Sequence, residues 1–344
     1  MSYTKYFTGG LLAASLLVSC KKDVTYDVTG DPEVKFFTNN VSAGNLPDNA
    51  LGFNIVNYPN AAGGEELLNL STSLPDTIKI PVFSTRPVSQ DVVIHAELDT
   101  SLIAAYNAAH NTSYSAFPAG ILKTSGLSAK LMKGASTSVE SIAIPTVRNG
   151  LHTLTGKAYM APIRLTTVSN RAAGQISAGS TSQVTYVVAG VELRRIKYLA
   201  VAADAQGTLV SPRTGWSSSF MPAPSINGSI FDGSTTTYTR WTASPAQVDV
   251  NMQGPVNVTG IRLHTATSAT YVPTRVDVYL SQDGINYDLI GSPLKANITY
   301  AASYNYILFY KAIQAQYIRL VLYYVTNTNT QNYRLTELDV YAGL

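Results

Sequence analysis

The chain has 344 residues, a formal net charge of +3 and 13% charged residues, about half the usual share. Its length fits two domains, and its 22 tyrosines, with many Thr, Ser and Val residues, are typical of half-exposed β-strands. A single cysteine excludes a disulfide framework, and the lack of a concentrated basic cluster argues against a nucleic-acid partner. We therefore expect a two-domain, all-β protein that does not bind nucleic acid.

The N-terminus has the layout of a secretory signal peptide. Lys5 gives a short basic start, and residues 9–18 (GGLLAASLLV) form an uncharged apolar run. This run is too short for a transmembrane helix, which needs about 20 residues. No later stretch has the length and apolar character of a span, so we expect the chain to be exported.

The apolar run ends in Leu17-Val18-Ser19-Cys20. This tetrapeptide resembles the bacterial lipobox, and the resemblance implies cleavage before Cys20 and lipid attachment to its thiol. Two or more acyl chains anchor a protein stably to a bilayer. We expect a lipoprotein signal peptide over residues 1–20, a tether over residues 21–33 and anchoring in the outer membrane at the cell surface. The alternative is an ordinary signal peptide that ends in Cys20 by chance.

Residues 34–200 alternate short apolar runs with turn signals, which predicts an N-terminal β-sandwich. One segment differs, because Leu102, Ile103 and Tyr106 fall at helical spacing and Asp99 or Thr100 is placed to cap a helix. We therefore expect one short helix within residues 99–110. Strands are expected over residues 77–83, 90–98, 139–147 and 182–188.

Two stretches of this part carry a resemblance. DTSLIAAYNAAHNTSYSAFP (residues 99–118) and AYMAPIRLTTV (residues 158–168) are similar to the N-terminal domain of unknown function found in many surface lipoproteins of the Bacteroidetes. The resemblance covers about residues 35–190. It implies a place at the cell surface beside outer-membrane polysaccharide-uptake proteins, and it implies no chemistry. We place the end of this domain near residue 200.

Residues 201–344 show strand patterns and no convincing helical period. Apolar residues alternate with polar ones at Val276, Val278 and Leu280, at Ile318, Leu320 and Leu322, and at Leu338 and Val340. Period-two alternation predicts strands with one buried face. The tight-turn sequence Ser281-Gln282-Asp283-Gly284 separates two of them. The pattern predicts an antiparallel sandwich or jelly roll.

Four motifs in this part resemble the discoidin family, also called the coagulation factor 5/8 C-terminal domain. They are Phe231-Asp232-Gly233 with Thr239-Arg240-Trp241, VDVYLSQDGINYDL (residues 276–289), Tyr317-Ile318-Arg319-Leu320 and LTELDVY (residues 335–341). The resemblance implies a jelly roll of the galactose-binding type, with Trp241 in the core and ligand binding through loops at one end. Two features depart from the family: the interval from Asp232 to Trp241 is longer, and Tyr287 replaces a tryptophan.

The resemblance also implies a structural Ca²⁺ beside the opening loop, as in many bacterial sugar-binding members. By resemblance its ligands would be Asp232, Ser234, Thr239 and Glu337, whose carboxylates and hydroxyls suit a hard cation. The alternatives are a simple turn residue at Asp232 and a solvent-facing carboxylate at Glu337.

A sugar offers C–H faces to aromatic rings and hydroxyls to polar side chains. The loops at residues 264–274 and 326–334 and the threonine-rich opening loop carry such side chains. We expect a glycan to contact Tyr271, Asn332, Tyr333, Arg334, Tyr238 and His264. The alternative for each is a residue of an ordinary solvated loop.

The sequence contains no recognisable catalytic motif. A glycosidase needs two facing carboxylates, and a pair such as Asp283 with Glu337 is compatible with the sequence. We expect a protein that binds glycan without catalysis, in a polysaccharide-capture system. The main alternative is a protein-interaction or adhesion module, and a carboxylate pair in a deep cleft would instead indicate an enzyme.

Overall fold

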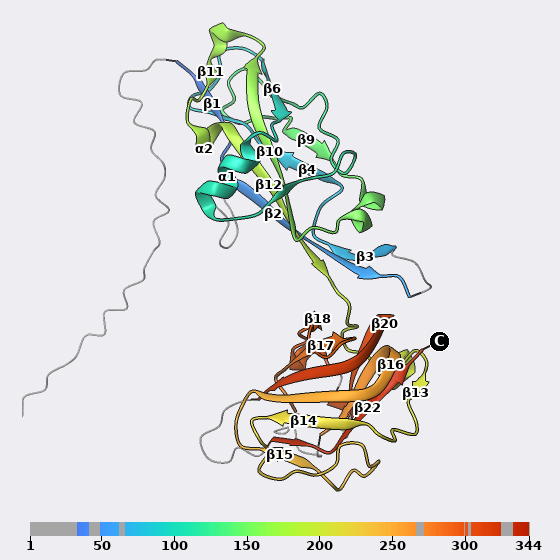
Figure 1. Cartoon of the computed structure of the whole chain (residues 1–344). Helices are drawn as coiled ribbons and strands as arrows, with labels where there is room; N and C mark the ends of the chain where they lie inside the picture. The colour runs from blue at the N-terminus through green and yellow to red at the C-terminus, as the bar shows by residue number, and fades with distance from the viewer. Residues whose placement is uncertain are drawn as a thin grey trace, which may run out of the picture.

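A computed structural model describes residues 33–40, 49–61, 66–265, 272–298, 300–301, 304–324 and 333–343. These residues form two β-rich units, one ending with β12 (Val184–Leu193) and the other beginning with β13 (Thr208–Leu209) (Figure 1). Cys20, the expected signal peptide and the expected tether up to residue 32 lie outside the described residues. In the described ranges, no helix combines the length and the apolar character needed to cross a membrane.

The N-terminal unit is a β-sandwich. Its larger sheet runs in the order β3 (Leu67–Thr72), β2 (Ala50–Pro59), β12, β10 (Ala158–Val168), β6 (Val92–Leu98) and β8 (Ser128–Leu131), with β7 (Ser115–Ala116) beside β10. Smaller sheets are made by β11 (Gln175–Ile176), β1 (Lys35–Phe37) and β5 (Phe83–Ser84), and by β4 (Thr77–Ile80) and β9 (Ile142–Pro145). Ile78 and Ile142 of a small sheet share one core with Ile94 and Ile163 of the large sheet. The sheets therefore pack face to face.

The expected helix is α1 (Leu102–His110), and its apolar side packs on the large sheet. Ile103 and Tyr106 are buried against Met160 of β10 and Val188 of β12. The N-cap residue is Ser101, and no side chain caps the helix, so the expectation of a cap from Asp99 or Thr100 is wrong. The carboxylate of Asp99 accepts only the N–H of Ser101, before the first turn. A four-residue helix, α2 (Ser180–Gln183), was not expected; the remaining helical turns are η1 (Arg148–Thr153), η2 (Arg171–Ala173), η3 (Ala202–Asp204) and η5 (Lys295–Asn297).

The C-terminal unit is an antiparallel sandwich built on two long strands, β16 (Ala246–His264) and β20 (Tyr304–Tyr323). The first half of β16 lies beside β14 (Ser217–Met221), and its second half lies beside β22 (Glu337–Ala342). The other strands are β17 (Arg275–Ser281), β18 (Asp288–Gly291), β19 (Tyr300–Ala301), β15 (Thr239–Trp241) and β21 (Tyr333–Leu335). In Figure 1 the two long strands run across the unit as its main pair.

A main core fills the C-terminal unit, and a smaller cluster surrounds Leu308. The pairing of β16 with β20 shifts register between Asn251 and Val256, where the strands bend, yet residues before and after this point reach the same core. The alternating residues that predicted strands, such as Val278, Leu320 and Val340, are buried in it. Trp241 is also fully buried, as the resemblance implied. The predicted all-β sandwich is therefore confirmed for this unit.

A short segment joins the two units. β12 pairs in parallel with β2, and directly after it the N–H of Arg194 donates to the carbonyl of Asn57. Ile196 then forms a β-bridge with Phe309 of β20. The ring of Tyr58 at the end of β2 lies 4.4 Å from the ring of Tyr310. The segment therefore contacts both units, and the two units also contact each other through Tyr58 and Tyr310.

Candidate functional site

Strand ends converge at one end of the C-terminal unit. β15 pairs with β21 there, with Trp241 opposite Tyr333. Tyr333 stacks on Tyr324, which follows the end of β20. One residue beyond the end of β21, the same segment reaches the end of β16, because the N–H of Thr336 donates to the carbonyl of His264. This end, which we call the loop end, is where the predicted binding loops leave the strands.

Tyr333 belongs to the core at the loop end. Its side chain is only 4% exposed, and its ring lies 4.1 Å from the ring of Tyr324 at an angle of 12°. Antiparallel pairing points Tyr333 to the same side as Trp241, which is the inner side. The expectation that Tyr333 is an exposed sugar contact is therefore wrong.

His264 also lies beneath the surface. It is 4% exposed, and Tyr304 packs edge-on at 4.8 Å between ring centroids. The hydroxyl of Thr336 donates to the carbonyl of His264 (2.8 Å), so Nδ1 of the ring is the donor in its close contact with that hydroxyl. Burial, with the charge of Arg262, lowers the pKa of His264. The neutral His264 thus holds Thr336 in place. The expectation that His264 contacts a sugar directly is wrong.

Arg334 and Tyr238 lie on the outer side of the same ribbon. The guanidinium carbon of Arg334 sits 4.5 Å from the centre of the Tyr238 ring, and both side chains are half-buried. A cation over an aromatic face is attracted by the ring and is held in place. Of the six residues expected to contact glycan, these two are brought together with access to solvent.

Tyr271 and Asn332 lie outside the described residues. The chain is described again at Val272 and at Tyr333, both of which are buried at the loop end. The roles expected for Tyr271 and Asn332 therefore stay predictions.

The opening loop folds around Asp232. Its carboxylate accepts the N–H of Ser234 at 2.9 Å and the hydroxyl of Thr237 at 2.7 Å. Burial would raise the pKa of Asp232, but these bonds, together with one from Glu337, hold it below its ordinary value. Thr237 was not expected at this site; it lies in the threonine run that lengthens the loop.

Glu337 lies beside Asp232 and is buried rather than solvent-facing. It is 3% exposed, and one of its carboxylate oxygens accepts the N–H of Gly233 at 3.2 Å. The guanidinium of Arg213 contacts its other oxygen and also lies 2.8 Å from Asp339. Burial raises the pKa of Glu337 to about 7, against the opposing effect of Arg213.

Three of the four expected calcium ligands, Asp232, Ser234 and Glu337, thus lie in or beside one turn. Asp232 and Glu337 form an adjacent carboxylate pair with the hydroxyls of Ser234 and Thr237 in the same turn, an oxygen set that fits a hard divalent cation. Thr239 does not share in it, because its buried hydroxyl donates to the carbonyl of Gly228. No group of three or more His, Cys, Asp or Glu side chains placed for a metal occurs in the described parts of the chain.

Asp283 and Glu337 are held by separate elements. Asp283 lies in the β17–β18 turn, where one carboxylate oxygen accepts the N–H groups of Ile285 and Asn286, both at 2.8 Å. Glu337 is engaged on β22 by Gly233 and Arg213. Each carboxylate therefore serves its own element.

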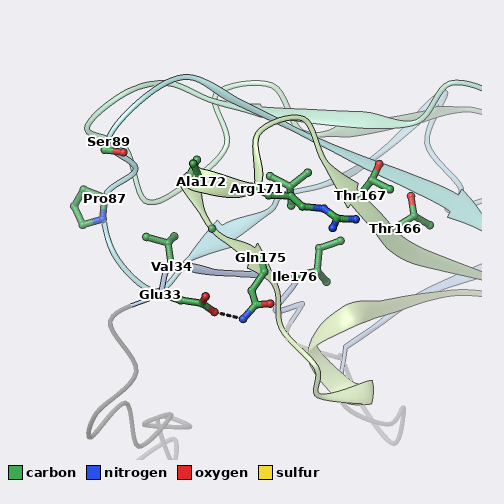
Figure 2. A pocket seen from close by; sticks show the side chains of 13 residues that line it. Glu33, Val34, Pro87, Ser89, Thr166, Thr167, Arg171, Ala172, Gln175 and Ile176 are labelled. Atoms are coloured by element: carbon green, nitrogen blue, oxygen red, sulfur yellow. Dashed lines mark hydrogen bonds between the residues drawn. The ribbon is translucent and has the colours of Figure 1, made fainter.

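One hollow lies in the N-terminal unit. It has a volume of about 860 Å³ and lies between the end of β10, η2 and the start of β1. Figure 2 shows Glu33 hydrogen-bonded to Gln175 at one side and Arg171 extending toward Thr167 at the other. A smaller hollow of about 270 Å³ lies on β14, β16 and β20, where Asp249 pairs with Arg319. Each is lined by one carboxylate, where glycoside hydrolysis needs two.

Two family models match parts of the chain. Residues 212–337 match the F5/8 type C domain. A second model, which describes an N-terminal domain, matches residues 53–172. Both resemblances seen in the sequence are confirmed by these matches, and a search of curated proteins finds no match.

One solved two-domain structure supports the fold, and two others are similar to part of the chain. A two-domain protein of unknown function from Bacteroides fragilis is 14% identical, with a TM-score of 0.55 over 93% of this chain and 99% of that chain. The C-terminal domain of a Bacteroides fragilis chitobiase is 24% identical, with a TM-score of 0.32, and covers 39% of this chain and 97% of its own. A family 32 carbohydrate-binding module of Clostridium perfringens NanJ, in complex with galactose, is 19% identical, with a TM-score of 0.33 over 39% of this chain and 98% of its own.

Replacing Tyr333 with Ala should destabilise the C-terminal unit by about 3 to 5 kcal/mol, because a buried stacked ring is lost and a cavity remains. Replacing the half-buried Tyr238 with Ala should cost less than about 1.5 kcal/mol. Urea unfolding followed by tryptophan fluorescence measures this unit, since both tryptophans, Trp216 and Trp241, lie in it. Equal losses for the two variants would contradict the buried position of Tyr333.

Proposed function

We propose that this protein is a lipid-anchored, non-catalytic glycan-binding protein of the cell envelope, working within a polysaccharide-capture system. The observation that carries the proposal is the loop end of the C-terminal unit. There Arg334 and Tyr238, which are far apart in the sequence, present a guanidinium and an aromatic ring beside the loops expected to carry Tyr271 and Asn332. The match of residues 212–337 to the F5/8 type C domain supports a ligand-binding role for this end.

The core beneath the site supports binding without induced rearrangement. Tyr333, Tyr324 and Trp241 pack tightly under the ribbon, and His264 with Thr336 fixes its exit toward β22. A site on a rigid base loses less conformational entropy on binding. The N-terminal unit would then serve as spacer or docking platform for partner proteins of the outer membrane.

A protein-interaction or adhesion module is the second candidate function. An F5/8 type C fold does not by itself define the ligand, because one fold hosts many binding functions. The experiment below therefore includes an arm that detects protein partners.

The full chain should bind at least one glycan on a broad array of oligosaccharides and polysaccharides. We expect dissociation constants of about 10 µM to 1 mM, because a shallow site leaves many sugar hydroxyls hydrated. Tyr238→Ala should weaken binding by roughly 1 kcal/mol, about fivefold. Tyr198→Ala, which removes an exposed ring from the segment between the units, is the matched control and should leave binding unchanged.

Failure to bind any glycan, together with co-purification of envelope proteins whose capture is lost in Tyr238→Ala, would favour the interaction module. Equal weakening by Tyr198→Ala and Tyr238→Ala would show that the loop end is not the binding surface.

A structural Ca²⁺ forms part of the proposal. Asp232 and Glu337 would hold it, with Ser234 and Thr237 nearby, and the ion would neutralise the carboxylate pair and stiffen the opening loop. The folded-state pKa of Glu337 is raised from 4.5 to about 7. Without calcium, protonated Glu337 therefore contributes its full share to the free energy of unfolding below pH 4.5. This contribution, about 3 kcal/mol, is lost as the pH rises to about 7.

Calcium should reverse this loss. Its ligands must be deprotonated, so ~1 mM Ca²⁺ should raise the melting temperature of the full chain by about 5 °C near pH 8 and by much less near pH 5. Glu337→Gln should abolish the calcium effect at both pH values. Glu140→Gln, a substitution at an exposed position of the N-terminal unit, should retain it. Melting curves that are identical with Ca²⁺ and with chelator at pH 8 would rule out the ion.

Lipid attachment at Cys20 is tested in cells. Cys20→Ala should abolish incorporation of labelled palmitate and remove the protein from the detergent phase, because the thiol that would carry the lipid is gone. Ser19→Ala keeps the thiol and should retain the label. Palmitate incorporation that persists in Cys20→Ala would exclude Cys20 as the lipid site.

A further inference from the structure

Two arginines lie directly opposite each other at the loop end. In the β15–β21 ribbon Arg240 is the register partner of Arg334, so both side chains point to the outer side. Ile226 extends the same row, because its backbone forms a β-bridge with Arg240. The row Ile226, Arg240 and Arg334 therefore crosses the outer surface of the ribbon, with the ring of Tyr238 beneath Arg334.

Placing two like charges on directly opposite strand positions is unfavourable for folding. Arg240 makes no ion pair within the described residues; its Nε donates instead to the hydroxyl of Ser225 at 3.0 Å. The ribbon thus carries a concentrated positive charge in a chain whose net charge is only +3.

Both guanidiniums are held before any ligand arrives. Arg334 lies 4.5 Å from the ring centre of Tyr238, and Arg240 is bonded to Ser225, whose own N–H donates to the carbonyl of Arg240 at 2.7 Å. A fixed guanidinium fork can bind two oxygens of a carboxylate or of a sulfate with two parallel hydrogen bonds. Ile226, which is 37% exposed, adds an apolar contact for the C–H groups of a sugar ring.

We infer that the glycan bound at the loop end is acidic, with a carboxylate or sulfate held between Arg240 and Arg334. The inference rests on the proposed glycan-binding function and adds the chemical class of ligand and a contact residue, Arg240. An anion between the arginines turns their mutual repulsion into attraction toward the ligand. Neutral glycans leave the repulsion in place and gain only the weaker contacts.

The test compares acidic polysaccharides with neutral counterparts on the full chain. Polygalacturonate is paired with its fully methyl-esterified form, and sulfated galactan with unsulfated galactan, so that the sugar backbone within each pair is the same and only the acidic group changes. We expect at least about tenfold tighter binding to one or both acidic members, falling as salt is raised. The two pairs distinguish a carboxylate ligand from a sulfate ligand.

Variants assign the effect to the ribbon. Arg240→Gln should reduce the affinity for the acidic glycan about tenfold without lowering the melting temperature, and Arg240→Lys should keep part of this affinity. The control Arg86→Gln, at an exposed position of the N-terminal unit, should bind as the wild type does. Equal binding within each pair, or preference for the neutral member, would overturn the acidic ligand while leaving glycan binding intact. An unchanged affinity in Arg240→Gln would overturn the arginine pair. Binding to no glycan at all would overturn the proposed function itself.

Discussion

The antiparallel pairing of β16 with β20 is the constraint on which the C-terminal unit depends. It runs from Ala246 opposite Leu322 to His264 opposite Tyr304, and shifts register in between. A bulge bends a strand and increases its twist. Because the pair bends, its two halves can lie on opposite sides of one core, with β14 and β17 completing one layer and β22 the other.

The same bend determines where the candidate binding surface lies. The ribbon β15–β21 links the end of β20, through the Tyr324–Tyr333 stack, to the end of β16, through Thr336 and His264. Alternation along so short a ribbon sends Trp241 and Tyr333 inward and Arg240 and Arg334 outward. The buried rings therefore determine where the half-buried guanidiniums lie, and the proposed glycan contact would depend on core packing one residue away.

A group of charged side chains fixes the segment between β13 and β14 to the sheet of this unit. Arg213, which follows β13, contacts Glu337 and Asp339 of β22, and Arg262 of β16 pairs with Asp339 at 2.7 Å. Removing one member of such a group leaves another charge buried and uncompensated, which costs several kcal/mol. The group therefore fixes how the segment before β14 crosses the sheet. Burial raises the pKa of Glu337, and Arg213 opposes this effect.

Much of the architecture could be read from the sequence because it follows from local patterns. Alternation at Val276, Val278 and Leu280 predicted β17 with its buried face, and the spacing of Ile103 and Tyr106 predicted α1 with its buried side. The helix α2 has only four residues, too few to show a period. The discoidin motifs also indicated Trp241 as a core residue and Asp232 and Glu337 as neighbours, 105 positions apart.

The tertiary structure decided which polar and aromatic residues face solvent. Tyr333 and Arg334 are adjacent in a loop-like sequence, and only the pairing with Trp241 and Arg240 shows that one is core and the other surface. Arg213 meets Glu337 across more than a hundred residues, a contact that no local pattern encodes. The sequence by itself determined the strands, the fold class and the end of the sandwich that would bind, since period-two patterns and family motifs are local. Strand register, which joins residues distant in the chain, alone determined that two arginines stand side by side at that end.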